Sequence, residues 1–254
     1  MVYRIRYSCV SYIGNCRELN QDNLSCDGEY LPVERSRAEF RKSGCTTSKS
    51  SPLFGVFDGM GGEECGEIAS WLAAKRAAEL HPGRDVPASL FRFCKEANEE
   101  ICRYADEHAL SATGTTAAIL VFGARKITLC NIGDSKIFRL SDGKLKQLSE
   151  DHLMPAPYGE KAPLSQNLGI PASELRIEPY VAQGGYAVGD LFLICSDGLT
   201  DMVTEKRIRR LSGRGSPEEI TQALLQEALH NGGRDNVTVL CCRIEGRSLF
   251  EFSF

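Results

Sequence analysis

Residues 53–62 read Leu53-Phe54-Gly55-Val56-Phe57-Asp58-Gly59-Met60-Gly61-Gly62. An apolar run typical of a buried strand stops at a carboxylate, and three glycines follow within four residues. Glycine allows the backbone to turn sharply or to approach a ligand closely. An Asp on such a loop can hold a cation, although Asp-Gly is also an ordinary turn. The other acidic strand ends of the chain decide between these two interpretations.

Three more carboxylates lie where an apolar strand meets a glycine or a tight turn: Asp134, Asp197 and Asp235. Each alone is a common turn residue, but the four together, with Asp58, predict convergence at one end of a sheet stack. Crowded carboxylates repel one another and lose solvation, and bound cations relieve both effects. Oxygen ligands without His or Cys favour Mg²⁺ or Mn²⁺. Two such ions can activate a bridging water and clamp a phosphate.

The polar turn at residues 14–23 supplies a cation that could face the same site. Arg17 and Asp22 lie five residues apart in it, and the alternative interpretation is a solvated loop. An arginine there could hold phosphate oxygens through two parallel hydrogen bonds. The site predicted from the residues is therefore an acidic metal centre with a phosphate-binding arginine.

The order of expected elements predicts an α+β fold in which helices cover antiparallel sheets. We expect strands at residues 3–13, 53–58, 115–122, 126–132, 135–140, 144–148, 175–182, 190–195 and 237–244, and helices at 63–80, 87–108 and 217–230. Ser216 and Glu219 form a capping-box pattern at the start of the last helix. Residues 28–52 are interpreted as a polar surface insertion with a short helix from Val33 to Lys42. Residues 149–175 are interpreted as an irregular, proline-punctuated loop that could face a substrate.

Composition narrows the class of protein. The chain has 254 residues, 42% apolar and 25% charged, with a net charge of -4. We expect one domain over residues 1–254, since no repeat and no break in composition is visible. The acidic balance argues against nucleic acid as the main partner, and no apolar run is long enough to span a membrane. No apolar signal-peptide centre is visible at the start, so we expect a cytoplasmic protein whose eleven cysteines are free thiols.

Six ordered motifs carry a resemblance to a known family. They are Arg17 with Asn20-Gln21-Asp22, Val56-Phe57-Asp58-Gly59-Met60-Gly61-Gly62, Gly114-Thr115-Thr116, Asn131-Ile132-Gly133-Asp134-Ser135, Ser196-Asp197-Gly198-Leu199 and Gly233-Arg234-Asp235-Asn236-Val237-Thr238-Val239. Over about residues 3 to 245, the chain resembles the metal-dependent protein phosphatases of the PP2C type, in their free-standing bacterial branch. The resemblance implies an αββα sandwich whose two antiparallel sheets meet at a dinuclear metal site.

The resemblance also implies roles for individual residues. Asp58 would bridge two Mn²⁺ or Mg²⁺ ions, with the Gly59 carbonyl on one ion and Asp197 and Asp235 on the other. Asp22 would hold metal-bound waters, and Asp134 with Asp197 would hold a possible third ion. Arg17 would bind the phosphoryl group, and a metal-bridging water would attack phosphoserine or phosphothreonine directly. The substrate would be a phosphoprotein that is either the target of a serine/threonine kinase or such a kinase itself.

Two departures from the family pattern bear on mechanism. Met60 stands where some eukaryotic members have a histidine proposed as the general acid, so leaving-group protonation needs another source. The loop at 149–175 is shorter than the usual flap of the family, so substrate preference is the least transferable property.

Two alternatives remain open, and two others are not supported by the residues. A phosphatase-like domain could bind a partner without turnover, since a fold does not fix a function. A metal-dependent hydrolase of small phosphate esters or nucleotides would use the same groups. Cys241 and Arg247 have the C-x5-R spacing of cysteine phosphatases, but Cys241 continues a strand and no histidine precedes it. No G-x-S-x-G sequence supports a serine hydrolase.

Overall fold

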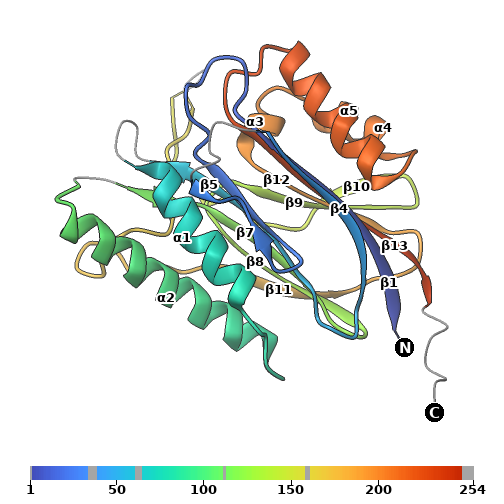
Figure 1. The fold of residues 1–254 in the computed structure, drawn as a ribbon, viewed down its shortest axis with the longest axis horizontal. Coiled ribbons are helices and arrows are strands. Elements are labelled where there is room, and N and C mark those ends of the chain that lie inside the picture. Colours follow the sequence, from blue (N-terminus) through green and yellow to red (C-terminus); the bar gives the residue numbers. More distant parts are fainter. Residues whose placement is uncertain (1, 34–38, 61–64, 111–112, 158–160, 248–254) are drawn as a thin grey trace.

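The computed structural model describes residues 2–33, 39–60, 65–110, 113–157 and 161–247. Two antiparallel sheets lie face to face and carry helices on their outer faces (Figure 1). One sheet has the strand order β10-β9-β12-β13-β1-β4. The other has the order β11-β8-β7-β5-β2-β3, with β6 paired to β5. The expected αββα sandwich is therefore confirmed.

The helices and strands have the following bounds. The strands are β1 Tyr3–Tyr12, β2 Asp22–Cys26, β3 Glu29–Tyr30, β4 Phe40–Thr47, β5 Leu53–Met60, β6 Gly114–Thr115, β7 Ala117–Phe122, β8 Lys126–Ile132, β9 Lys136–Ser141, β10 Lys144–Gln147, β11 Tyr180–Gly185, β12 Leu191–Cys195 and β13 Val237–Arg247. The helices are α1 Gly66–Glu79, α2 Val86–Glu107, α3 Asp197–Thr200, α4 Glu205–Ser212 and α5 Pro217–His230.

Strand β5 shows how the sequence builds three layers. Successive side chains of a strand point to opposite faces of its sheet. Phe54 and Val56 pack between the two sheets, whereas Leu53 and Phe57 pack under α1 and α2. Both faces of β5 are therefore buried, which explains an apolar run without polar alternation. The run ends at Asp58, where the strand reaches the rim of the sandwich.

The outer helices are fixed by small residues and by capping. The buried face of α1 is made largely of alanines, which let the helix lie close to the sheet. Ser216 accepts a hydrogen bond from the Glu219 N–H, and the Glu219 carboxylate accepts one from the Ser216 N–H, so the expected capping box is present. Helices α4 and α5 pack on the sheet that contains β12 and β13.

The helix expected from Val33 to Lys42 is wrong where the structure describes it. Residues 40–47 form β4, an edge strand paired with β1. Its polar composition suits an edge, where charged side chains blunt pairing with another sheet. Lys42 lies over the Tyr7 ring at 5.9 Å and pairs with Glu29. A polar edge strand was thus mistaken for an insertion with a helix.

Smaller differences concern element boundaries. The strand expected at 115–122 is divided into β6 and β7. The strand expected at 175–182 corresponds to β11, which begins five residues later than expected. Helices α3 and α4 were not predicted as elements. The loop at 149–175 contains no named strand or helix among its described residues, as expected, but a bridge joins Leu153 to Leu164. Gly61, Gly62 and the end of the Phe-rich tail lie outside the described residues.

Two further expectations concern the membrane and the cysteines. Within the part of the chain that the structure describes, no helix is long and apolar enough to cross a membrane. All eleven cysteines are free thiols, and most are buried. The expectation of buried thiols is therefore confirmed for seven of them, whereas Cys16 and Cys45 are exposed and Cys65 and Cys102 are half-buried.

Candidate active site

One pocket gathers the residues that sequence reasoning singled out. It has a volume of about 380 Å³ and lies at the rim where both sheets end. Its lining comes from widely separated segments and consists of Arg17, Gln21, Asp58, Gly59, Met60, Thr116, Asp134, Lys161, Ala162, Pro163, Leu164, Asp197 and Asp235. The predicted convergence of the acidic strand ends is thus confirmed as geometry.

Asp22 lies directly beside this pocket. It is the residue opposite Asp58 in the register of β2 and β5, so both side chains lie on the same side of the sheet. Asp22 is only 2% exposed, and its carboxylate accepts a hydrogen bond of 2.7 Å from the Ser196 hydroxyl. This bond joins the two sheets beneath the site, because Ser196 directly follows β12 and Asp22 begins β2, which are strands of different sheets.

The Gly114-Thr115-Thr116 motif holds the end of β5 in place. The Asp58 N–H donates to the Thr116 hydroxyl at 3.0 Å, and the Thr116 N–H donates to the Asp58 carbonyl at 2.9 Å. The Thr116 hydroxyl also hydrogen-bonds the Ser135 hydroxyl at 2.7 Å. One threonine therefore couples the backbone of Asp58 to the turn that carries Asp134.

Two glycines are needed because neighbouring backbone comes very close. A Cβ at Gly59 would lie 2.2 Å from the Gly66 carbonyl oxygen and 2.4 Å from that of Gln21. A Cβ at Gly198 would lie 1.9 Å from the Asn236 carbonyl oxygen. Any side chain at either position would force the acidic loops apart. The Asp-Gly pairs are therefore tight junctions of the site rather than exposed turns.

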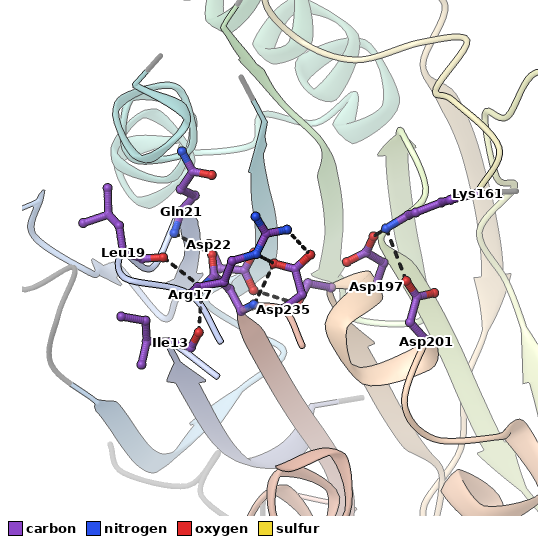
Figure 2. A network of polar contacts seen from close by, with 11 residues as sticks. Ile13, Arg17, Leu19, Gln21, Asp22, Lys161, Asp197, Asp201 and Asp235 are labelled. Carbon is purple, nitrogen blue, oxygen red and sulfur yellow. Dashed lines mark hydrogen bonds and ion pairs between the residues drawn. The ribbon is translucent and has the colours of Figure 1, made fainter. Parts of the chain in front are cut away.

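Arg17 reaches the pocket and pairs with Asp235 (Figure 2). Its Nε lies 3.0 Å from Oδ1 and a terminal nitrogen lies 2.8 Å from Oδ2. The loop that carries Arg17 is tied down by Asn236, whose side chain accepts the Gln21 N–H and donates to the carbonyls of Ile13 and Leu19. Asn236 belongs to the sequence motif at residues 233–239, but its hydrogen bonds to the loop that carries Arg17 were not predicted.

Lys161 is the main charged residue of the pocket that was not predicted from the sequence. It lies in the irregular segment before Pro163, and its ammonium pairs with Asp197 and, at 3.2 Å, with Asp201. Asp201 follows Asp197 by four residues, so the two carboxylates share one side of a helical turn. That spacing was the available signal for Asp201, whereas no periodic pattern points to Lys161.

Burial and mutual repulsion raise the pKa values of the acidic residues at this site. Burial raises the pKa of Asp22 to about 7, against hydrogen bonds from Ser196 and Thr238 that lower it. Burial and the charges of Asp197 and Asp22 raise the pKa of Asp58 well above its ordinary value. Burial and Asp197 raise the pKa of Asp134 to about 6, although Lys161 opposes this rise. Excess negative charge of this kind is what cations would neutralise.

The donor set fits hard divalent ions. The ionisable lining residues of the pocket are carboxylates and two cations, and His and Cys do not occur among the described ones. In the described ranges, no three His, Cys, Asp or Glu side chains form a group arranged to hold an ion. Two of the carboxylates, Asp197 and Asp235, are engaged by Lys161 and Arg17. The oxygen chemistry therefore suits Mn²⁺ or Mg²⁺, in competition with the protein's own cations.

The structure agrees with the argument against a cysteine phosphatase. Cys241 lies inside β13, where it pairs with Ser8 of β1 and is fully buried. Burial raises its pKa to about 12, which keeps the thiol protonated and poorly nucleophilic.

Comparisons with known proteins agree with this geometry. The model of the Protein phosphatase 2C family matches residues 42–231. The serine/threonine protein phosphatase PstP of Mycobacterium tuberculosis is 31% identical over 202 residues, which cover 74% of this chain and 39% of PstP. The chain therefore spans about two fifths of the length of that relative.

A second relative and a solved structure of the PstP catalytic domain are similar over most of their length. The serine/threonine phosphatase stp of Listeria monocytogenes is 29% identical over 214 residues, which cover 75% of this chain and 84% of that protein. The crystal structure of the PstP catalytic domain in complex with two manganese ions superposes with a TM-score of 0.78 and 27% identity. It covers 97% of this chain and 100% of that domain. With a family model matched over most of its length, this chain belongs to the Protein phosphatase 2C family.

Proposed function

We propose that this chain is a Mn²⁺- or Mg²⁺-dependent phosphatase that hydrolyses phosphoserine and phosphothreonine in proteins. The observation that carries the proposal is the single pocket in which carboxylates from four distant strand ends meet an arginine. The relatives named as serine/threonine phosphatases, and the manganese-bound PstP domain, support it. The prediction of one catalytic domain over residues 1–254 stays a prediction, as does a cytoplasmic location.

We propose the metal-holding groups to be those that the resemblance implies: Asp22, Asp58, the Gly59 carbonyl, Asp134, Asp197 and Asp235. Two divalent ions bound there would lower the pKa of a bound water, so that hydroxide is available to attack phosphorus near neutral pH. They would also neutralise the charge of the phosphate. Asp58 has the central place, because it lies opposite Asp22 on the neighbouring strand and lines the pocket with the other carboxylates.

Arg17 is proposed to bind the phosphoryl group. Its side chain is 52% exposed, and the pair with Asp235 uses Nε and one terminal nitrogen, so the other terminal nitrogen takes no part in that pair. A guanidinium can hold two phosphate oxygens at once, which fixes the phosphorus for attack from the opposite side. Phosphate at the site would compete with Asp235 for this guanidinium.

The leaving-group proton cannot come from Met60, which lines the pocket and has no acidic hydrogen. Among the described lining residues no histidine is present to take that role. We propose that water in the pocket supplies this proton. The substrate is proposed to be a phosphoprotein that is a kinase target or a kinase.

The test compares three classes of substrate with purified protein. Phosphoserine and phosphothreonine peptides, free nucleotides and para-nitrophenyl phosphate are each assayed with Mn²⁺, with Mg²⁺ and with EDTA. We expect metal-dependent hydrolysis that favours the phosphopeptides. Preference for nucleotides would instead support a hydrolase of small phosphate esters, and absence of turnover with any metal would support a silent binding module.

A further inference from the structure

Lys161 extends into the acidic pocket from the irregular segment that joins β10 to β11. Its ammonium group is shared by Asp197 and Asp201, the carboxylates at the two ends of one turn (Figure 2). The Asp197 side chain is only 13% exposed, whereas the Lys161 side chain is 59% exposed. An exposed cation of the protein thus pairs with a nearly buried carboxylate at the mouth of the site.

The segment that carries Lys161 is anchored to the turn that carries Asp134. The His152 N–H donates to the Gly133 carbonyl at 3.1 Å, and the Gly133 N–H donates to the His152 ring at 3.2 Å. The returning half of the segment is bound to the first half, because the Met154 N–H donates to the Pro163 carbonyl at 2.8 Å. Lys161 lies two residues before Pro163, so its tether is short and its local concentration at Asp197 is high.

Lys161 and a divalent ion would compete for the same carboxylate. Asp134 and Asp197 line the pocket together with Lys161, and an ion held by these two carboxylates would share Asp197 with the ammonium that now contacts one of its oxygens. Like charges a few ångströms apart also repel each other, although solvent around an exposed lysine weakens the effect. The ammonium therefore disfavours binding of such an ion, and the ion disfavours the contact of the ammonium with Asp197.

We propose that Lys161 is a tethered cation that competes with an additional divalent ion for Asp197 and so limits the pocket to two ions. When the ammonium is on Asp197, the Asp134–Asp197 pair holds no further ion. When the lysine side chain turns out to solvent, that pair becomes available. The inference rests on the proposed function, because it assumes that divalent ions bind to this pocket.

The experiment measures Mn²⁺ binding directly, without turnover. Isothermal titration calorimetry and electron paramagnetic resonance of free Mn²⁺ give the number of bound ions and their Kd for the full chain. The variants are Lys161→Met, which keeps the stem and removes the charge, and Lys161→Arg, which keeps the charge. Lys95→Met is the matched control, since Lys95 is an exposed lysine of α2 that pairs with Glu99 on the same helix.

We expect the wild-type protein, Lys161→Arg and Lys95→Met to bind two ions. Lys161→Met is expected to bind a third, or to lower the Kd of its weakest ion by about tenfold, the effect expected when a partly screened charge is removed. Adding Asp134→Asn to Lys161→Met is expected to abolish that extra binding, which assigns it to the Asp134–Asp197 pair.

Equal numbers and affinities of bound ions in wild type and Lys161→Met would overturn the role of Lys161 while leaving two-metal catalysis untouched. Extra binding that survives Asp134→Asn would also overturn it, because the ion would then lie elsewhere. Absence of Mn²⁺ binding in every variant would remove both this inference and the proposed function.

Discussion

Arg17 and Asp235 form a two-point ion pair between residues 218 positions apart in the sequence. The pair joins the loop before β2 to the loop before β13, so it closes one side of the pocket. Because Asp235 is also a proposed metal-holding residue, this guanidinium can pass from Asp235 to a phosphoryl group when cations bind. Substitution of Arg17 therefore tests substrate binding, measured as KM, separately from the chemical step, measured as kcat.

Arg17→Ala is expected to raise the KM for para-nitrophenyl phosphate and phosphopeptides. Losing charged hydrogen bonds costs about 1.5–3 kcal/mol, which corresponds to roughly tenfold to a hundredfold. Steady-state kinetics at saturating Mn²⁺ measure the change, with Arg125→Ala on the exposed turn before β8 as the control. An unchanged KM would remove Arg17 from the phosphate site, and a loss of kcat alone would mean that it acts chiefly in the transition state.

Asp58→Asn and Asp197→Asn are expected to abolish Mn²⁺-dependent turnover while leaving the fold intact. Each substitution removes a charged oxygen ligand but keeps the size of the side chain, so kcat/KM should fall by at least about a hundredfold. Kinetics and circular dichroism check the two halves of this statement. Asp142→Asn is the matched control, because Asp142 lies in a hairpin turn at φ 49°, a conformation that Asn adopts readily. Near-normal rates in either site variant would refute the site assignment.

The acidic strand ends could be predicted from the sequence because each lies where an apolar strand meets a glycine, which follows Asp58 and Asp197 and precedes Asp134 and Asp235. Asp58 and Asp197 are examples: burial of the strand and close approach at the glycine leave few other arrangements. Lys161 could not be predicted in this way, since its position depends on how an aperiodic loop returns to Pro163. Strand β4 could not be predicted for a related reason: its half-buried face alternates with an exposed one, but the half-buried positions include Lys42, Gly44 and Thr46, so the sequence shows no apolar alternation.

The stability of the metal-free protein is expected to decrease as the pH rises from 5 to 8. Burial, followed by repulsion from neighbouring carboxylates, raises the pKa of Asp22 to about 7 and that of Asp134 to about 6. The folded state therefore binds more protons than the unfolded state above pH 4, and this stabilisation is lost as the pH rises through the folded-state values.

Thermal unfolding in EDTA at pH 5, 6, 7 and 8 measures this effect. A change of 1 kcal/mol shifts the Tm of a chain of this size by about 2–4 °C. Saturating Mn²⁺ should raise the Tm most at pH 8 and flatten the pH dependence, because bound cations replace the protons. A Tm in EDTA that rises steadily between pH 5 and pH 8 would contradict the raised pKa values.

Asn236 provides a test of how the site is held together, separate from its charges. Its side chain makes three hydrogen bonds to the backbone of the loop that carries Arg17, at 2.8, 2.8 and 3.0 Å. Asn236→Ala leaves these partly buried backbone groups without partners, so we expect a loss of unfolding free energy of about 1–3 kcal/mol. Asn236→Asp keeps an acceptor for the Gln21 N–H but places a charged oxygen against the carbonyls of Ile13 and Leu19, so we expect it to lose at least as much unfolding free energy as Asn236→Ala. Urea unfolding gives the free energies, and kinetics should show a raised KM in both variants, because a looser loop positions Arg17 less well. If Asn236→Ala unfolds at the wild-type urea midpoint with an unchanged KM, the loop is held by other contacts and Asn236 has no bracing role.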